Sequence, residues 1–136
     1  MSRSALYTVN SSTQALTDGS LLNLGSIIRR FGCNCNLSGN AIRIQGEGYY
    51  TVDASIIIAP TAAATTLTLT LLKDGVAVPG GIARTAVTTA GNPVTVPIAA
   101  MIKENCACCD DASNLTIALT GGAATVTNVA VVTEKI

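Results

Sequence analysis

Histidine and tryptophan are absent from this chain of 136 residues, and aromatic residues make up only 3% of it. Without histidine, the chain cannot build a Ser–His–Asp triad, a Cys–His pair or a histidine-ligated metal site. Most hydrolases and transferases depend on such a general base. We therefore expect a protein that is not an enzyme, with no catalytic residues and no cofactor.

Charge is also scarce, because only 12% of the residues are charged and the formal net charge is zero. A nucleic-acid partner requires clustered positive charge, so we expect none. Low charge also removes the repulsion that keeps a free monomer in solution. With 49% hydrophobic residues, the chain is typical of a protein that covers part of its surface in an assembly.

Long hydrophobic runs are missing. The apolar stretch at residues 56–59 is far too short to cross a membrane, so we expect no membrane partner. Residues 1–7 contain no apolar segment of the kind found in a secretory signal peptide. We therefore expect the protein to be made in a cytoplasm, where cysteines stay reduced by default.

Threonine, valine, isoleucine and alanine dominate what is present, and 12 glycines divide the chain into short segments. This composition is typical of strands joined by turns. The alternation is clearest where Leu67, Leu69 and Leu71 alternate with threonines. The predicted strands cover residues 5–10, 21–30, 41–45, 49–59, 66–72, 76–78 with 82–89, 94–102, 115–119 and 125–136.

Short connections between about eight to ten such strands predict an all-β fold, an antiparallel β-sandwich or jelly roll. We expect a single domain over residues 1–136, in which residues 1–20 hold a first strand and a possible arm. Two polar segments, 31–40 and 103–113, are predicted loops. Pro97 places its strand at a sheet edge or a bulge.

The last predicted strand contains four consecutive apolar residues, Val129 to Val132. Such a strand is apolar on both faces, which favours a sheet covered by the core on one side and by another subunit on the other. Val129, Val131 and Val132 are therefore our candidates for a subunit interface.

Five cysteines form two groups, Cys33 with Cys35 and Cys106 with Cys108 and Cys109. Three interpretations stay open: reduced and packed thiols, disulfides within or between subunits, and a thiolate metal site. The Cys-x-Cys spacing differs from the Cys-x₂-Cys of structural zinc sites. Because five is odd, at least one thiol stays free or pairs across a subunit boundary. None of the three predicts catalysis.

One stretch of the sequence resembles a known protein family. Residues 42–55, Ile-Arg-Ile-Gln-Gly-Glu-Gly-Tyr-Tyr-Thr-Val-Asp-Ala-Ser, resemble the central signature of C1q/TNF-like jelly rolls. The apolar strand that leads into Lys73-Asp74-Gly75 is similar to a hairpin of that family, and Asp-Gly favours a type I′ turn. Residues 115–136 are similar to the last two strands of its bacterial and phage branch, which includes the C-terminal domains of spore-surface collagen-like glycoproteins.

The resemblance implies a jelly roll of about ten strands that forms a homotrimer, with the first and last strands adjacent in the inner sheet. Its signature residues are Gly48, Tyr49, Tyr50, Asp74 and Gly75, and we expect both tyrosines in the core. The sequence departs from the spore glycoproteins in having no collagen-like Gly-X-Y segment.

These observations favour a structural protein that decorates a particle, most simply a bacteriophage head decoration or head-fibre protein located in the virion. Its partners would be two further copies and a capsid or other particle protein. The alternative is a receptor- or carbohydrate-binding tip module of a phage or spore surface. That function needs exposed aromatic side chains, of which the sequence offers few.

Overall fold

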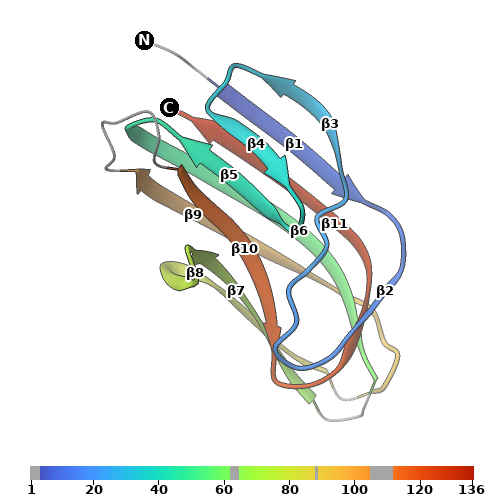
Figure 1. The fold of residues 1–136 in the computed structure, drawn as a ribbon. Coiled ribbons are helices and arrows are strands. Elements are labelled where there is room, and N and C mark those ends of the chain that lie inside the picture. Colours follow the sequence, from blue (N-terminus) through green and yellow to red (C-terminus); the bar gives the residue numbers. More distant parts are fainter. Residues whose placement is uncertain (1–3, 62–64, 88, 105–111) are drawn as a thin grey trace.

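The computed structural model describes residues 4–61, 65–87, 89–104 and 112–136, and these form two antiparallel sheets packed face to face (Figure 1). One sheet has the order β3-β1-β11-β6-β9, with short β2 paired to β11, and the other has the order β4-β5-β10-β7-β8. The strands are β1 (Ser4–Asn10), β2 (Gln14–Leu16), β3 (Ser26–Phe31), β4 (Cys35–Ser38), β5 (Ala41–Gln45), β6 (Gly48–Pro60), β7 (Thr65–Lys73), β8 (Val76–Val87), β9 (Val94–Glu104), β10 (Ala112–Thr120) and β11 (Ala124–Lys135).

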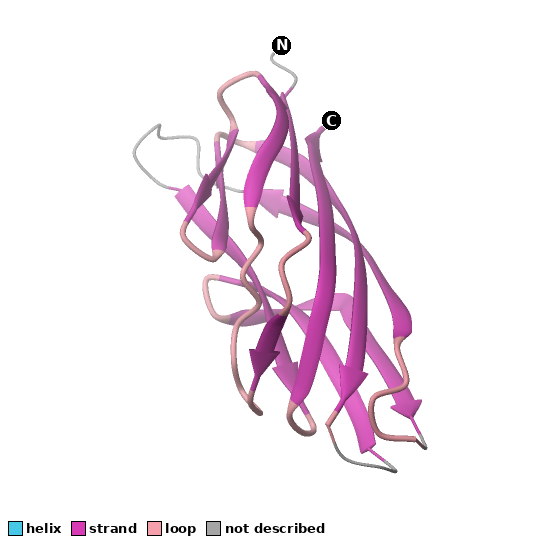
Figure 2. Cartoon of the chain, turned by 90° about the vertical axis from the view of Figure 1, so that its right-hand side faces the viewer, coloured by secondary structure: helices cyan, strands magenta, loops and turns pink. Residues whose placement is uncertain are grey.

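The chain crosses between the sheets repeatedly, as in a jelly roll (Figure 2). The first strand, β1, pairs along its whole length with the last, β11. This adjacency is the one that the resemblance implied. The described residues form no helix long and apolar enough to cross a membrane.

The core lies between the sheets and follows the predicted alternation. Along β6, Tyr50, Val52, Ala54, Ile56 and Ile58 are buried, whereas the residues between them are not. The second sheet contributes leucines and isoleucines from the inward positions of its central strands: Ile42, Ile44, Leu67, Leu69, Leu71, Leu115, Ile117 and Leu119. Period-two patterning therefore predicted the buried faces of β6 and of the central strands of the second sheet.

The predicted hairpin at Asp74-Gly75 is confirmed. Both residues have positive φ, 51° for Asp74 and 83° for Gly75, as a type I′ turn requires. The Asp74 carboxylate also accepts a hydrogen bond from the backbone N–H of Asn114, at 2.9 Å. The turn is thereby tied to the neighbouring strand β10.

Two segments differ from the prediction. Residues 21–30 do not form one strand, because the positive φ of Gly25 (84°) lies outside the range of an extended strand, and β3 starts only at Ser26. Leu22 and Leu24 are buried as expected, but Ile28 is 47% exposed. The predicted loop 31–40 contains β4, a short edge strand whose pairing with β5 its sequence does not reveal.

The prediction that Pro97 marks an edge strand is confirmed, whereas the interruption expected at Pro79 to Gly81 is absent. The segment with Pro79, Gly80 and Gly81 does not interrupt β8, which runs on with a register shift against β7 between Thr70 and Leu72. Both β8 and β9, which contains Pro97, are edge strands. An edge position tolerates proline because one side of the strand makes no ladder hydrogen bonds.

Candidate interaction face

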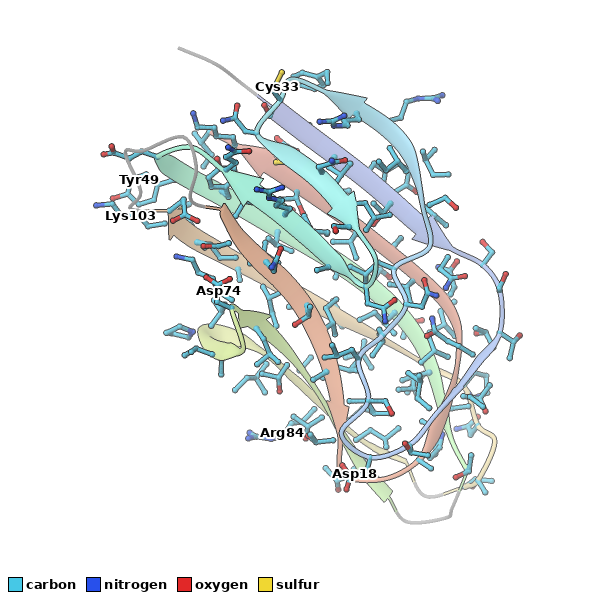
Figure 3. All side chains as sticks on the ribbon, viewed as in Figure 1. Asp18, Cys33, Tyr49, Asp74, Arg84 and Lys103 are labelled. Atoms are coloured by element: carbon cyan, nitrogen blue, oxygen red, sulfur yellow. The ribbon has the colours of Figure 1, made fainter. Side chains whose placement is uncertain are left out.

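The signature tyrosines point to opposite sides of the sheet, because successive strand residues alternate. Tyr50 is fully buried, and its hydroxyl donates to the carbonyl oxygens of Gln45 and Gly46, both at 2.8 Å. Tyr49 is 49% exposed, and the Lys103 ammonium lies 5.6 Å from its ring centroid (Figure 3). The expectation of a core position was therefore wrong for Tyr49.

A small polar cluster surrounds Tyr50 at one end of the core. The Ser4 hydroxyl donates to the Asn34 side-chain oxygen at 2.8 Å, and the Asn34 amide group donates to the Gln45 carbonyl at 2.7 Å. Burial raises the pKa of Tyr50 to about 12, so its hydroxyl stays protonated at neutral pH. The cluster closes this end of the sandwich and leaves Tyr50 as a structural residue.

The first cysteine pair is divided between a turn and a strand, because Cys33 lies between β3 and β4 and Cys35 is the first residue of β4. Cys33 is exposed beyond the end of β3, whereas Cys35 is buried, and both are free thiols. Burial raises the pKa of Cys35 to about 11 against the opposing effect of Arg30 and Lys135, so its thiol is a poor nucleophile. Cys106, Cys108 and Cys109 lie outside the described residues. The described part of the chain contains no cluster of residues that could hold a metal.

The three valines predicted for an interface are divided between two environments. Val129 and Val131 are fully buried in the core of the single chain, so their side chains are not available to another subunit. Val132 is half-buried on the opposite face of β11. The run is apolar on both faces, as expected, but only Val132 and its neighbour Ala130 face away from the core.

Register defines the residues that share this outer face of the six-stranded sheet. Arg29, Tyr7, Val132, Asp53 and Ala99 form one row across five strands, since each is the Cα partner of the next. The adjacent row is formed in the same way by Ser26, Val9, Ala130, Ser55 and Pro97. We call these two rows the outer face.

The middle of the outer face is apolar. Tyr7 and Val9 of β1 lie against Val132 and Ala130 of β11, and all four side chains are half-buried. Charge appears only toward the flanks of the rows, at Arg29 and Asp53, and in the next row at Glu134. An antiparallel sheet with a solvated face normally alternates apolar and polar residues, and these two central strands do not.

The corresponding face of the five-stranded sheet is different. The outward positions of its central strands β7 and β10 are mostly threonine, at Thr66, Thr68, Thr70, Thr116 and Thr120, and the others described are Leu72, Asn114 and Ala118. Threonine presents a hydroxyl to water and suits a solvated sheet. The two faces of the sandwich are therefore chemically unequal: threonine dominates the middle of this one, although Leu72 and Ile82 also lie on it, and apolar side chains form the middle of the outer face.

A cavity of about 260 Å³ lies between the edge strands β8 and β9. Its lining is mainly apolar, with Val76, Val78 and Met101, and Lys73 and Lys103 are its charged residues. The Lys73 ammonium already donates to the Lys103 carbonyl at 2.9 Å. The lining provides no paired carboxylates and no nucleophile, and the volume falls below that of ordinary ligand pockets.

Sequence reasoning missed Tyr7 and Val9 as members of the outer face. The signal was present, because Ala5, Tyr7 and Val9 form one apolar face of the strand and Leu6 adds a large apolar side chain to the other. It is the same pattern that was recognised in Val129 to Val132. The position of Ala99 on the outer face could not be predicted, because a single alanine in a strand is compatible with either face.

Comparison with known proteins places this architecture in the C1q/TNF-like class of jelly rolls. Murine APRIL at pH 8.0 matches with a TM-score of 0.72 and 11% identity, covering 99% of this chain and 100% of that one. The globular domain of zebrafish complement 1qA gives 0.69 and 9%, over 97% and 95% of the two chains. The PRD1 vertex protein P5 gives 0.61 and 15%, also over 97% and 95%.

These identities establish a shared fold and no closer relationship. No protein-family model matches the sequence, and neither does any curated protein.

Proposed function

We propose that this chain is a non-enzymatic structural protein that forms a homotrimer through the outer face and decorates a particle. The observation that carries the proposal is the apolar middle of that face, Tyr7, Val9, Ala130 and Val132, next to a threonine-rich face on the other sheet. Covering apolar surface stabilises an assembly. The number three is taken from the C1q/TNF class, whose members typically form trimers.

The particle we propose is a bacteriophage virion, with this protein as a head decoration or head-fibre protein. Support comes from the likeness in fold to a vertex protein. In such a role the outer face is buried between the subunits of the trimer, and the threonine-rich face and the loops contact the particle. Immunogold labelling of virions purified from a lysate of the source culture tests this step, and unlabelled virions would contradict it.

The trimer is tested by native mass spectrometry and light scattering of the full chain. We expect a species of three chain masses of 13.7 kDa each. Ala130→Asp, in the middle of the outer face, should yield monomers, because a carboxylate would be buried without a partner. The matched control is Ala118→Asp, the same change at a half-buried outward position of β10. If the unchanged protein is a monomer, or if both variants lose the trimer equally, the proposal fails.

A binding tip is the alternative, and two exposed aromatic residues bear on it. Phe31 is 61% exposed and Tyr49 is 49% exposed. They do not form one stacking platform, because Phe31 lies in the edge strand β3 and Tyr49 in β6, on the far side of β1 and β11. Saturable binding on a glycan array that is lost in Phe31→Ala or Tyr49→Ala would favour this alternative over decoration.

A further inference from the structure

Strand β3 is an open edge of the six-stranded sheet. It pairs with β1 on one side, and no strand of the described residues pairs with its other side (Figure 1). All six of its residues are exposed, including three large apolar side chains, Ile27 at 39%, Ile28 at 47% and Phe31 at 61%. The Ile28 carbonyl accepts a long hydrogen bond from the Arg29 guanidinium, at 3.3 Å, and an added strand would compete with it as it pairs with the outer side of β3.

The other sheet edges contain proline or are short, whereas β3 has neither feature and carries a bulge and two arginines. Edge strand β9 has an exposed proline in its middle, Pro97, and edge strand β8 has Pro79 followed by Gly80. Edge strand β4 is only 4 residues long. Proline and short length are ordinary ways to prevent strand addition. Strand β3 contains no proline or glycine.

The sequence that contains β3 carries charge of one sign, and the nearest acidic residue across the sheet is Glu134, two strands away in the row of Phe31. Residues 19–46 contain three arginines, Arg29, Arg30 and Arg43, and no aspartate or glutamate. The Arg30 Nε donates to the Cys35 carbonyl at 2.9 Å, which holds its guanidinium between β3 and β4. Arg29 is exposed on the outer side of the strand. Because the whole chain is neutral, this positive region is a local feature.

Like charges make a second copy a poor occupant of this edge. Antiparallel pairing of two β3 strands would bring Arg29 and Arg30 close to the same residues of the other copy, and such contacts are destabilising. The bulge that leaves Ile28 without a Cα partner on β1 also twists the strand away from simple self-pairing. An opposite charge on the incoming strand would turn the same arginines into favourable partners.

We infer that β3 is a docking edge for an extended acidic segment of another protein, which adds to the six-stranded sheet as a further strand. Backbone hydrogen bonds would supply affinity, and the exposed apolar side chains with Arg29 would select a segment that alternates apolar and acidic residues. The edge exists in the single chain, but Arg29 and Ser26 of β3 also belong to the outer face, so the test must separate strand addition from trimer assembly.

The probe is a fluorescein-labelled peptide matched to β3 in length, with valine and glutamate in alternation. We expect saturable binding by fluorescence anisotropy to the full chain. Replacing glutamate by lysine in the peptide should abolish binding through repulsion, and a central proline should weaken it about tenfold or more by removing backbone hydrogen bonds. Slower hydrogen exchange of β3 amides on binding separates strand addition from ionic contact alone.

The protein variants are Arg29→Glu and its control Arg84→Glu, an exposed arginine on β8 of the other sheet. We expect Arg29→Glu to weaken binding about tenfold or more and Arg84→Glu to leave it unchanged. Because Arg29 also belongs to the outer face, the comparison is repeated in the Ala130→Asp background, where a change of assembly cannot account for the loss. Four results would overturn the inference: no binding, equal loss in both variants, binding without slower exchange in β3, or equally tight binding of polyphosphate.

Discussion

Two threonine hydroxyls in the core have no hydrogen-bond partner among the described residues, those of Thr8 and Thr133. Both residues are fully buried, and they lie on the paired strands β1 and β11. A buried hydroxyl without a partner costs free energy that an isosteric methyl group does not. Thr133→Val should therefore raise the free energy of unfolding by about 1 kcal/mol.

Urea unfolding measures this change, and Thr127→Val on an exposed position of the same strand is the control. The control should stay within about 0.5 kcal/mol of the unchanged protein. A loss of stability in Thr133→Val would show that its hydroxyl is bonded in solution, for instance to a buried water.

The buried thiol of Cys35 makes stability depend on alkaline pH. Its pKa is raised from 9.0 to about 11, chiefly by burial, so folding favours the protonated thiol. This contribution is complete below pH 9 and is lost as the pH rises toward 11. Cys35→Ala removes it, so the variant should lose less stability than the unchanged protein between about pH 8 and about pH 10.5.

Urea unfolding at the two pH values provides the comparison. Tyr50, whose pKa is raised to about 12, contributes a loss of the same sign at higher pH. Cys35 adds to the raised pKa of Tyr50, so the difference between the two proteins reports Cys35 together with its effect on Tyr50. Equal losses in both proteins would contradict the shift assigned to this thiol.

At the scale of secondary-structure elements, the β7–β8 hairpin depends on Asp74 in two ways. Asp74 adopts a positive φ, and its carboxylate binds the backbone N–H of Asn114. Asp74→Ala should lower the free energy of unfolding by about 1–2 kcal/mol, because alanine tolerates the left-handed region poorly and cannot accept the bond. Asp74→Gly keeps the backbone freedom and loses the bond, and Asp74→Asn keeps both.

The expected order of stability is Asn above Gly above Ala, measured by denaturant midpoints. If Gly and Ala are equally destabilising, the hydrogen bond and not the backbone conformation determines the effect. If all three match the unchanged protein, the hairpin tolerates any residue at this position.

The elements that the sequence predicted well are those whose two faces meet different surroundings. Strands β5, β6, β7 and β10 alternate between core and solvent, so period two located them and oriented their side chains. The bounds of strand β3 could not be predicted in this way, because neither of its faces meets the core and all its residues are exposed. Strand β4 was not predicted because four residues are too few to show a period of two.

The same reasoning limits what could be predicted of the interaction face. The outer face is assembled by register from five strands far apart in the sequence, and register comes from tertiary pairing. Apolar residues on both parities of one strand can be read locally, as at Val129 to Val132. Which of those residues face the core depends on the bulge between Val126 and Asn128, which changes the parity of β11 and carries no local signal.

At the scale of the whole molecule, the proposed assembly ties thermal stability to protein concentration. If folded subunits associate and unfolded chains do not, mass action favours the folded state as concentration rises. For a trimer, each tenfold increase in concentration adds about 1 kcal/mol per subunit, which raises Tm by a few degrees.

Differential scanning calorimetry over about a hundredfold range of concentration measures this dependence. The same series on Ala130→Asp should give a Tm that is lower and constant, whereas Ala118→Asp should keep the dependence. A constant Tm for the unchanged protein, combined with a monomer mass, would mean that the apolar middle of the outer face is covered by a different protein. In that case adding the separate partner, and not more of this chain, would raise Tm.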